Sequence, residues 1–202
     1  LKSLADNPVE SSWSRDEKLA YWINLYNAGT IKLILENYPV NSIQDINGGK
    51  PWDKRWIKSG DKTYTLNEIE NSVIRPQFNE PLIHFAVNCA SVGCPHLPPS
   101  AFTGALLNQQ LNRETRKFFS QPRNFQINRE NKTILLSSIL DWYQDDFIDW
   151  LNTRYPNKKK YSLLDYVAHY VDRDTAKELR GSAADYKILF IPYDWSLNDA
   201  KR

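Results

Sequence analysis

The chain has 202 residues, of which 41% are hydrophobic, 25% charged and 13% aromatic. Its 26 basic and 24 acidic residues leave a net charge of +2, which excludes the strongly basic surface typical of nucleic-acid-binding proteins. No apolar run reaches the roughly 18 residues that cross a bilayer, so we expect no transmembrane segment. The basic run 158-KKK-160 is interpreted as a solvated turn.

The length of the chain, without internal repeats or an interdomain linker, predicts a single domain over residues 1–202. We expect an N-terminal arm over about residues 1–13 and the body of the domain over residues 14–198. Because the chain starts at Leu1 rather than Met, we expect a processed or shortened chain in which a removed signal peptide leaves no trace.

A long helix is predicted to follow Ser14, since Ser14 and Glu17 form a capping-box pattern. It extends from Arg15 to about Asn37 and is apolar on nearly every face in its middle, which predicts a central, buried helix.

The next segment is expected to be irregular over residues 52–64, with a short strand over residues 62–66. A second helix is predicted from Asn67 to about Ile74, with Asn67 and Glu70 as its cap pattern and Pro76 as its stop.

The remaining elements alternate between strands and helices. We expect a buried strand over 82–89, a helix over 104–120, a hairpin of 124–128 and 133–137, helices over 138–152 and 163–180, and a last strand over 187–191. This pattern predicts a helix-rich α+β domain with a long central helix and a small, mainly antiparallel sheet.

The stretch 83-IHFAVNCASVGCPHL-97 holds two of the three histidines and both cysteines. On a strand over 82–89, His84 and Asn88 point to the same face and Cys89 lies at the end. The loop 90-ASVG-93 then returns Cys94 toward the strand, and such strand ends often carry reactive groups.

A thiol nucleophile at Cys89 or Cys94 requires a base, and that base requires an orienting partner. His84 is the candidate base. The candidates for orienting its imidazole are Glu70, Asn88 and Asp194.

Three other interpretations of the same residues stay open. Cys89 and His84 are equally typical of a buried core. In an oxidising compartment, Cys89 and Cys94 would form a disulfide, whereas in a cytosol they would be thiols. The pattern H-x4-C-x4-C, with Glu70, also offers metal ligands, although structural zinc sites use closer cysteine pairs.

Two amides, Asn24 and Asn27, lie three residues apart on the apolar central helix. An amide buried without hydrogen bonds costs about 1–3 kcal/mol, so each must bond to the backbone of a neighbour or line a polar pocket. We take Asn24, Asn27 and Asn88 as candidate substrate-binding residues.

In this order, the motifs resemble the family known as domain of unknown function 547. The resemblance rests on 21-YWINLYNAGTIKLIL-35, 66-LNEIEN-71, 82-LIHFAVNCASVGCPHL-97, 139-ILDWYQDDF-147 and 192-PYDWSLN-198. It places the polar positions of the family on Asn24, Asn27, Glu70, His84, Cys89 and Cys94. Many members carry His where this chain has Asn71.

The resemblance implies one domain with a site but assigns no chemistry. Bacterial members are often exported, which implies a periplasmic or extracellular setting and leaves a cytoplasmic one open. The predicted fold is also similar to that of papain-like and transglutaminase-like thiol enzymes, although no Cys lies on the central helix here.

The leading hypothesis is a thiol-dependent hydrolase or acyl transferase for amide or peptide-like substrates. Cys89 is the nucleophile with Cys94 as the alternative, His84 is the base, and Glu70 or Asn24 orients the base or the substrate. The first alternative is a non-enzymatic ligand- or protein-binding domain with a structural Cys89–Cys94 disulfide, and the second is a metal site. We expect no cofactor and an unknown small-molecule or peptide-like ligand; the sequence does not determine the oligomeric state.

Overall fold

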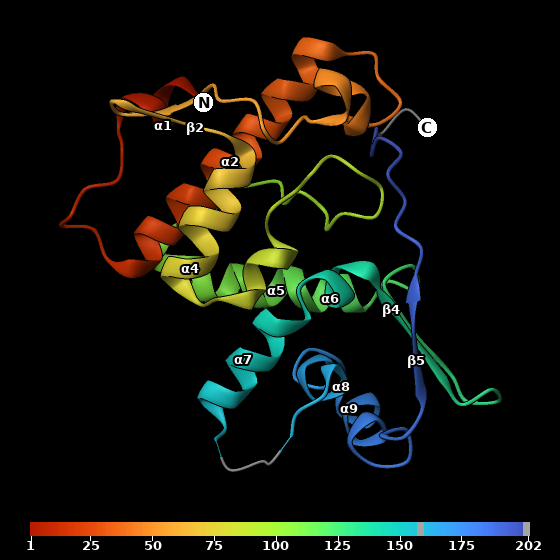
Figure 1. Ribbon diagram of the computed structural model, residues 1–202. Coiled ribbons are helices and arrows are strands. Elements are labelled where there is room, and N and C mark those ends of the chain that lie inside the picture. Colours follow the sequence, from red (N-terminus) through yellow and green to blue (C-terminus); the bar gives the residue numbers. More distant parts are fainter. Residues whose placement is uncertain (157–159, 200–202) are drawn as a thin grey trace.

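The computed structural model describes residues 1–156 and 160–199, so most of the basic run 158–160 lies outside the described residues. The fold is a helix-rich α+β arrangement, as predicted (Figure 1). The α-helices are α1 (Lys2–Asp6), α2 (Arg15–Asn37), α3 (Leu66–Glu68), α4 (Arg75–Phe78), α5 (Leu107–Phe119), α6 (Ser138–Trp142), α7 (Gln144–Arg154), α8 (Leu163–Val167) and α9 (Arg173–Arg180). The 3-10 helices are η1 (Ile43–Gly49), η3 (Pro81–Phe85) and η4 (Gly104–Leu106), and η2 (Ile69–Ile74) is π-helical.

Helix α2 is the centre of the fold and begins at the predicted capping box. The Ser14 hydroxyl accepts the Glu17 N–H, and the Glu17 carboxylate accepts the Ser14 N–H at 2.8 Å. Its middle is buried, with Leu19, Ile23 and Leu25 fully enclosed. Elements α3, η2, η4 and α5 pack around it, which explains why its sequence is apolar on most faces. Within the described part of the chain, no helix is long and apolar enough to cross a bilayer.

The strands form two small sheets. They are β1 (Ile57–Ser59), β2 (Lys62–Tyr64), β3 (Phe125–Asn128), β4 (Thr133–Ser137) and β5 (Lys187–Ile191). The pairs β1–β2 and β3–β4 are antiparallel, and the predicted hairpin places Phe125 opposite Leu136. Strand β5 pairs with β4 in parallel, with Ile134 opposite Ile188, after a crossover through α6 to α9.

The predicted strand over residues 82–89 is wrong. Pro81 begins η3, where the Glu80 side chain accepts the Leu82 N–H at 3.3 Å, and an irregular loop follows. Short apolar runs do not distinguish a strand from a buried helical turn. The Ala86 and Val87 N–H groups bond to the Ile83 carbonyl within the turn, and the Asn27 side chain on α2 bonds to the Ala86 carbonyl and the Asn88 N–H. These groups therefore need no neighbouring strand.

The second predicted helix differs in its cap and its end. Its capping box is formed by Thr65 and Glu68 rather than by Asn67 and Glu70. The helix does not stop at Pro76. Pro76 lies in the first turn of α4, where the N–H that proline lacks is not needed for the helix. Glu70 therefore does not cap the helix and lies buried on one side of η2.

The two helices predicted over 138–152 and 163–180 are each divided. The first breaks at Tyr143, between α6 and α7. The second ends at Ala168, and α9 begins only after Asp172, whose carboxylate accepts the N–H groups of Asp174 and Thr175.

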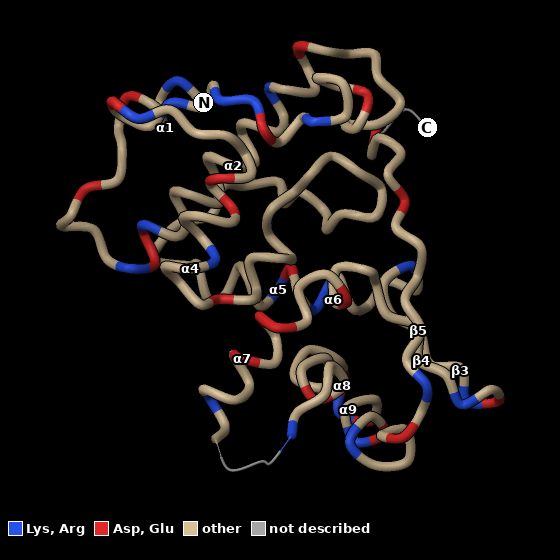
Figure 2. The backbone as a smooth tube through the Cα atoms, in the orientation of Figure 1, with Lys and Arg blue, Asp and Glu red and all other residues tan. Residues whose placement is uncertain are grey.

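The C-terminal segment lies along the loop that follows η3. The Val92 N–H donates to the Ser196 carbonyl at 2.8 Å, and the Gly93 N–H donates to the Asp194 carbonyl at 2.9 Å. In Figure 1 the loop lies between α2 and this segment, and Figure 2 shows it free of charged residues. The loop therefore carries no charged side chain, and hydrogen bonds from both the central helix and the C-terminal segment hold it in place.

Candidate functional site

A cavity of about 390 Å³ opens where η2, η3, the loop after η3, α6 and the C-terminal segment meet. We call it the aromatic-walled cavity. Its lining residues are Tyr26, Trp52, Asp53, Asn67, Glu70, Asn71, His84, Val87, Cys89, Cys94, Pro95, Ile139, Trp142, Tyr143, Tyr193 and Trp195. Four of the predicted catalytic residues, Cys89, His84, Glu70 and Cys94, thus line one cavity.

Glu70 forms part of the polar floor of this cavity. Its side chain is only 8% exposed, and the Tyr143 hydroxyl donates to its carboxylate at 2.8 Å. Tyr26 on α2 also lines the cavity, and its hydroxyl feels the charge of this carboxylate. Burial and the neighbouring Glu70 raise the pKa of both tyrosines above their usual range, so both hydroxyls keep their protons at neutral pH.

His84 also forms part of the floor and is paired with Asp146, which does not line the cavity. His84 Nε2 lies 2.7 Å from Asp146 Oδ2, and the His84 ring stacks on Tyr143 with centroids 3.8 Å apart. Arg75 holds the same carboxylate through two bonds, of 2.7 and 2.9 Å. Burial alone would raise the pKa of Asp146, but the bonds from His84 and Arg75 hold it well below its usual range. Asp146 is therefore ionised and orients the imidazole.

This pairing leaves one nitrogen of His84 unused. Nδ1 is buried and has no hydrogen-bond partner among the described residues. When Nε2–H donates to Asp146, Nδ1 of the neutral ring is an acceptor that can take a proton. Asp146 thus fixes the orientation of the ring through Nε2.

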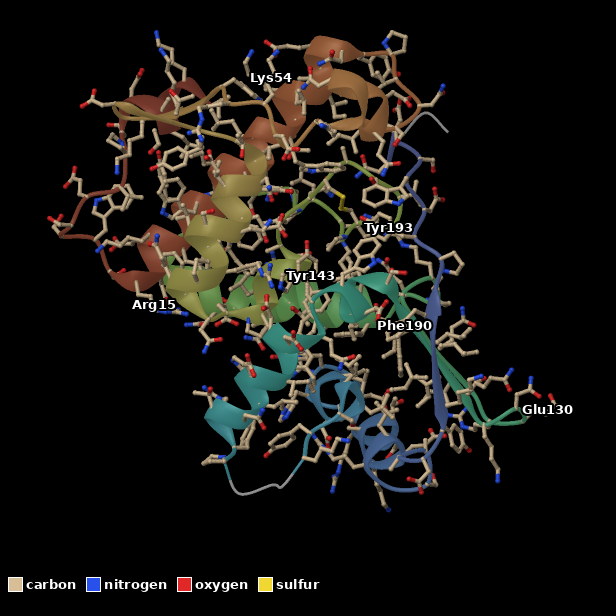
Figure 3. All side chains as sticks on the ribbon, viewed as in Figure 1. Arg15, Lys54, Glu130, Tyr143, Phe190 and Tyr193 are labelled. Carbon is tan, nitrogen blue, oxygen red and sulfur yellow. A yellow bond between two sulfur atoms is a disulfide. The ribbon has the colours of Figure 1, made fainter. Side chains whose placement is uncertain are left out.

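The two cysteines line the same cavity. Cys89 and Cys94 are joined by a disulfide, and neither thiol is free in this structure. The Tyr193 hydroxyl lies 3.1 Å from Cys89 Sγ and 3.2 Å from Cys94 Sγ (Figure 3). A Cβ at Gly93 would come within 2.8 Å of the Tyr193 ring, so the tyrosine can lie against this loop only because residue 93 is glycine.

Residues 10–119 match the model of the family described as Protein of unknown function, DUF547. This match covers more than half of the chain. The chain belongs to this family. No curated protein and no solved structure is similar enough to the chain to count as a match.

The part of the chain that matches DUF547 supplies Glu70, His84 and both cysteines, whereas the match does not extend to residues 139–147 and 192–198. These two segments complete the cavity with Trp142, Tyr143, Tyr193 and Trp195, and Asp146 supports it from outside. The site is therefore assembled from both halves of the chain.

The three predicted substrate-binding residues do not line this cavity; they are Asn24, Asn27 and Asn88. Asn24 exchanges two bonds, of 2.8 and 2.9 Å, with the backbone of Phe102. Asn27 donates to the Ala86 carbonyl at 2.9 Å and accepts the Asn88 N–H at 2.8 Å. Their predicted role in substrate binding stays a prediction.

Asn88, whose N–H bonds to Asn27, makes further hydrogen bonds within the loop. Its side chain donates to the Pro95 carbonyl at 2.7 Å and accepts the Ala90 N–H at 2.8 Å. The structure thus uses three amides to satisfy the backbone of a buried loop that has no sheet of its own.

Sequence reasoning missed the partner of His84. Of the three candidates for orienting it, neither Glu70, Asn88 nor Asp194 bonds to its ring; Asp146 does. The available signal was the piece 139-ILDWYQDDF-147, which contains Asp146 and two of the cavity's aromatic residues. The piece 192-PYDWSLN-198 gave the same kind of signal for Trp195, whereas Trp52 carried none.

The arrangement does not favour the metal alternative. Among the described residues, no group of three or more His, Cys, Asp or Glu side chains is placed to hold a metal ion. No hydrogen bond joins His84 to either sulfur, since Nε2 bonds to Asp146 and Nδ1 has no partner.

Proposed function

We propose that this DUF547 chain is a ligand-binding domain that holds a small organic molecule in the aromatic-walled cavity, with the Cys89–Cys94 disulfide as a structural part of the wall. The observation that carries the proposal is the composition of the cavity. Aromatic rings from distant segments form one wall, and the side chains of Glu70 and His84 form the floor.

Such a combination is typical of small-molecule sites, where apolar surface supplies affinity and a few fixed polar groups supply orientation. The cavity's volume of about 390 Å³ lies in the usual range for these sites. Trp142 is 48% exposed although it is a large aromatic residue, and it stands at the cavity with Tyr193 and Trp195. Exposed aromatic surface beside buried polar groups is available for a ligand to cover.

The test is a ligand-observed NMR screen of a mixed fragment library against the wild type and two tryptophan variants. Trp142→Ala removes part of the wall, and the fragments that bind the wild type are expected to lose about tenfold in affinity. Trp150→Ala is the matched control because Trp150 packs against Tyr155 and Tyr166, outside the cavity. If Trp142→Ala and Trp150→Ala affect binding equally, the ligand does not lie in this cavity.

A second candidate is the thiol-dependent hydrolase or acyl transferase, active after an external dithiol has reduced the disulfide. It is favoured by the position of both sulfurs in the same cavity as His84, beside the Tyr193 hydroxyl. Cys89 would give its proton to Nδ1 of His84, and the thiolate would attack an amide carbonyl. His84 would return the proton to the leaving amine, and water or an acceptor amine would then release the acyl group from Cys89. Asp146 would orient the imidazole, with Glu70 placing the substrate.

Activity-based labelling tests this second candidate. After reduction with dithiothreitol, one cysteine should react with iodoacetamide at neutral pH faster than a free thiol peptide does. Cys89→Ala and Cys94→Ala identify which sulfur reacts, and His84→Ala should slow it. Equal rates for the protein and the peptide would remove the support for thiol catalysis.

A further inference from the structure

Glu70 is a nearly buried carboxylate without a cationic partner among the described residues. Its side-chain hydrogen bond comes from the neutral hydroxyl of Tyr143, and no salt bridge among the described residues includes it. Arg75 is near but already committed, since it donates two bonds to Asp146 and one to Asn71. Buried charges in proteins are normally paired, so a positively charged ligand group beside Glu70 would be favoured.

The remaining charges at the cavity have the same sign. Asp53 lines it at an exposed position and takes part in no ion pair among the described residues. In the described part of the chain, neither lysine nor arginine lines this cavity. His84, its one basic side chain, already faces the ionised Asp146. An anionic ligand would meet two carboxylates and no free cation.

The aromatic wall also favours a positive ligand. Trp142 and Trp195 are stacked with centroids 5.8 Å apart, and the Tyr193 and Trp195 centroids are 4.5 Å apart. Trp52 meets Trp195 at 5.8 Å. Rings this close leave no slot between them, so a ligand must lie on their outer faces and edges. Aromatic faces carry the negative part of the ring quadrupole and attract cations.

We propose that the ligand of the aromatic-walled cavity is a small organic cation with an ammonium group. The proposal rests on the ligand-binding function proposed above and adds its chemical class. The ammonium nitrogen lies at the Glu70 end of the cavity, and the apolar part of the ligand lies against Trp142 and Trp195. Asp53 adds a second, exposed negative charge at the cavity.

Isothermal titration calorimetry with two probes of equal shape tests the charge directly. Choline is the cation, and 3,3-dimethylbutan-1-ol replaces its nitrogen with carbon and is neutral. We expect choline to bind the wild type about tenfold more tightly than the alcohol, and to bind more weakly as sodium chloride is raised. Methyl glucoside and inorganic phosphate, as neutral and anionic probes, should bind more weakly than choline.

Three variants locate the effect. Glu70→Gln removes the charge but keeps an acceptor oxygen for the Tyr143 hydroxyl, and it should weaken choline binding about tenfold without changing the binding of the alcohol. Asp53→Asn, at an exposed position that does not endanger folding, should weaken choline two- to threefold, roughly the effect of an exposed charge. Glu36→Gln, on the exposed end of α2, is the matched control and should change nothing.

The possible failures are distinguishable. If the alcohol or methyl glucoside binds as tightly as choline, or if folded Glu70→Gln and Asp53→Asn bind choline like the wild type, the cation proposal is wrong while the ligand-binding proposal stands. The cation proposal is also wrong if choline does not bind the wild type at millimolar concentration. If no fragment of the NMR screen depends on Trp142 either, the ligand-binding function fails with it.

Discussion

The loop after η3 and the floor of the aromatic-walled cavity both bury polar side chains, but the two regions give them different partners. Asn24, Asn27 and Asn88 bond to backbone groups of the loop, and each uses both ends of its amide. Glu70 and His84 bond to other side chains, and His84 keeps one nitrogen unpaired. The three amides thus have partners for both their donor and their acceptor groups, whereas Nδ1 of His84 at the cavity floor has none among the described residues.

This difference distinguishes polar side chains that hold the fold together from polar side chains that are available to a ligand. A side chain that satisfies buried backbone groups is needed wherever the chain folds, with or without a ligand. A side chain that bonds only to neighbouring side chains can exchange those partners for a ligand at small cost to the fold. If this distinction is right, substitutions in the loop region should act mainly on stability, and substitutions at the floor mainly on binding.

The largest loss of stability is expected for Asn27→Ala. It leaves the Ala86 carbonyl and the Asn88 N–H buried without partners, and each costs about 1–3 kcal/mol, so the unfolding free energy should fall by roughly 2–6 kcal/mol. Urea denaturation measures it. Asn112→Ala, which loses only an exposed bond within α5, is the control and should change little. A loss below about 1 kcal/mol for Asn27→Ala would contradict the structural role.

A smaller loss is expected when the disulfide is removed. It closes a short loop, and the chain-entropy estimate for a loop of this size is about 2 kcal/mol. The double variant Cys89→Ser with Cys94→Ser, compared with the wild type in urea, measures that contribution. Dithiothreitol should destabilise the wild type by a similar amount and leave the double variant unchanged. If dithiothreitol destabilises both proteins equally, the effect does not come from this bond.

Much of the fold could be predicted from the sequence, because several elements carry local signals. The capping box at Ser14, the apolar faces of α2 and the alternation in the β3–β4 hairpin each specify one element without reference to distant residues. The segment after Pro81 was predicted as a strand because its apolar run fits either element. Its backbone partner is the Asn27 side chain, 59 residues away in sequence from Ala86, and no local pattern reveals that.

The candidate site was predicted only in part for a similar reason. Cys89, His84, Glu70 and Cys94 do line one cavity, and three of them lie within a single short stretch. The partner of His84 lies 62 residues further along the chain, and the aromatic wall comes mainly from α6 and the C-terminal segment. Such pairings depend on how the elements pack, so sequence periodicity gives no access to them.

The ion pair at the floor predicts a measurable dependence of stability on pH. The pKa of Asp146 is lowered by folding, so its contribution is fully present above the unfolded value of about 4 and is lost as the pH falls below it. Because Asp146 is partly exposed, roughly 1 kcal/mol is expected. Asp146→Asn should therefore lose less stability than the wild type between pH 5 and about pH 2. Asp45→Asn, an exposed cap of η1, serves as the control. Parallel pH profiles for the wild type and Asp146→Asn would show that the pair does not stabilise the fold.

The smallest effect on stability is expected for Glu70→Gln, and this variant separates the two regions most sharply. Gln keeps an oxygen that can accept from Tyr143 and removes a charge without a cationic partner, so the unfolding free energy should change by less than about 1 kcal/mol. Urea denaturation of this variant beside Asn27→Ala gives the direct contrast, since both residues are buried and both replacements remove polar function. Glu70→Gln should stay folded and bind choline about tenfold more weakly, whereas Asn27→Ala should unfold more easily and, while still folded, bind choline as the wild type does. A loss of stability in Glu70→Gln as large as that in Asn27→Ala would place Glu70 among the groups that hold the fold and leave the cavity without its proposed anchor.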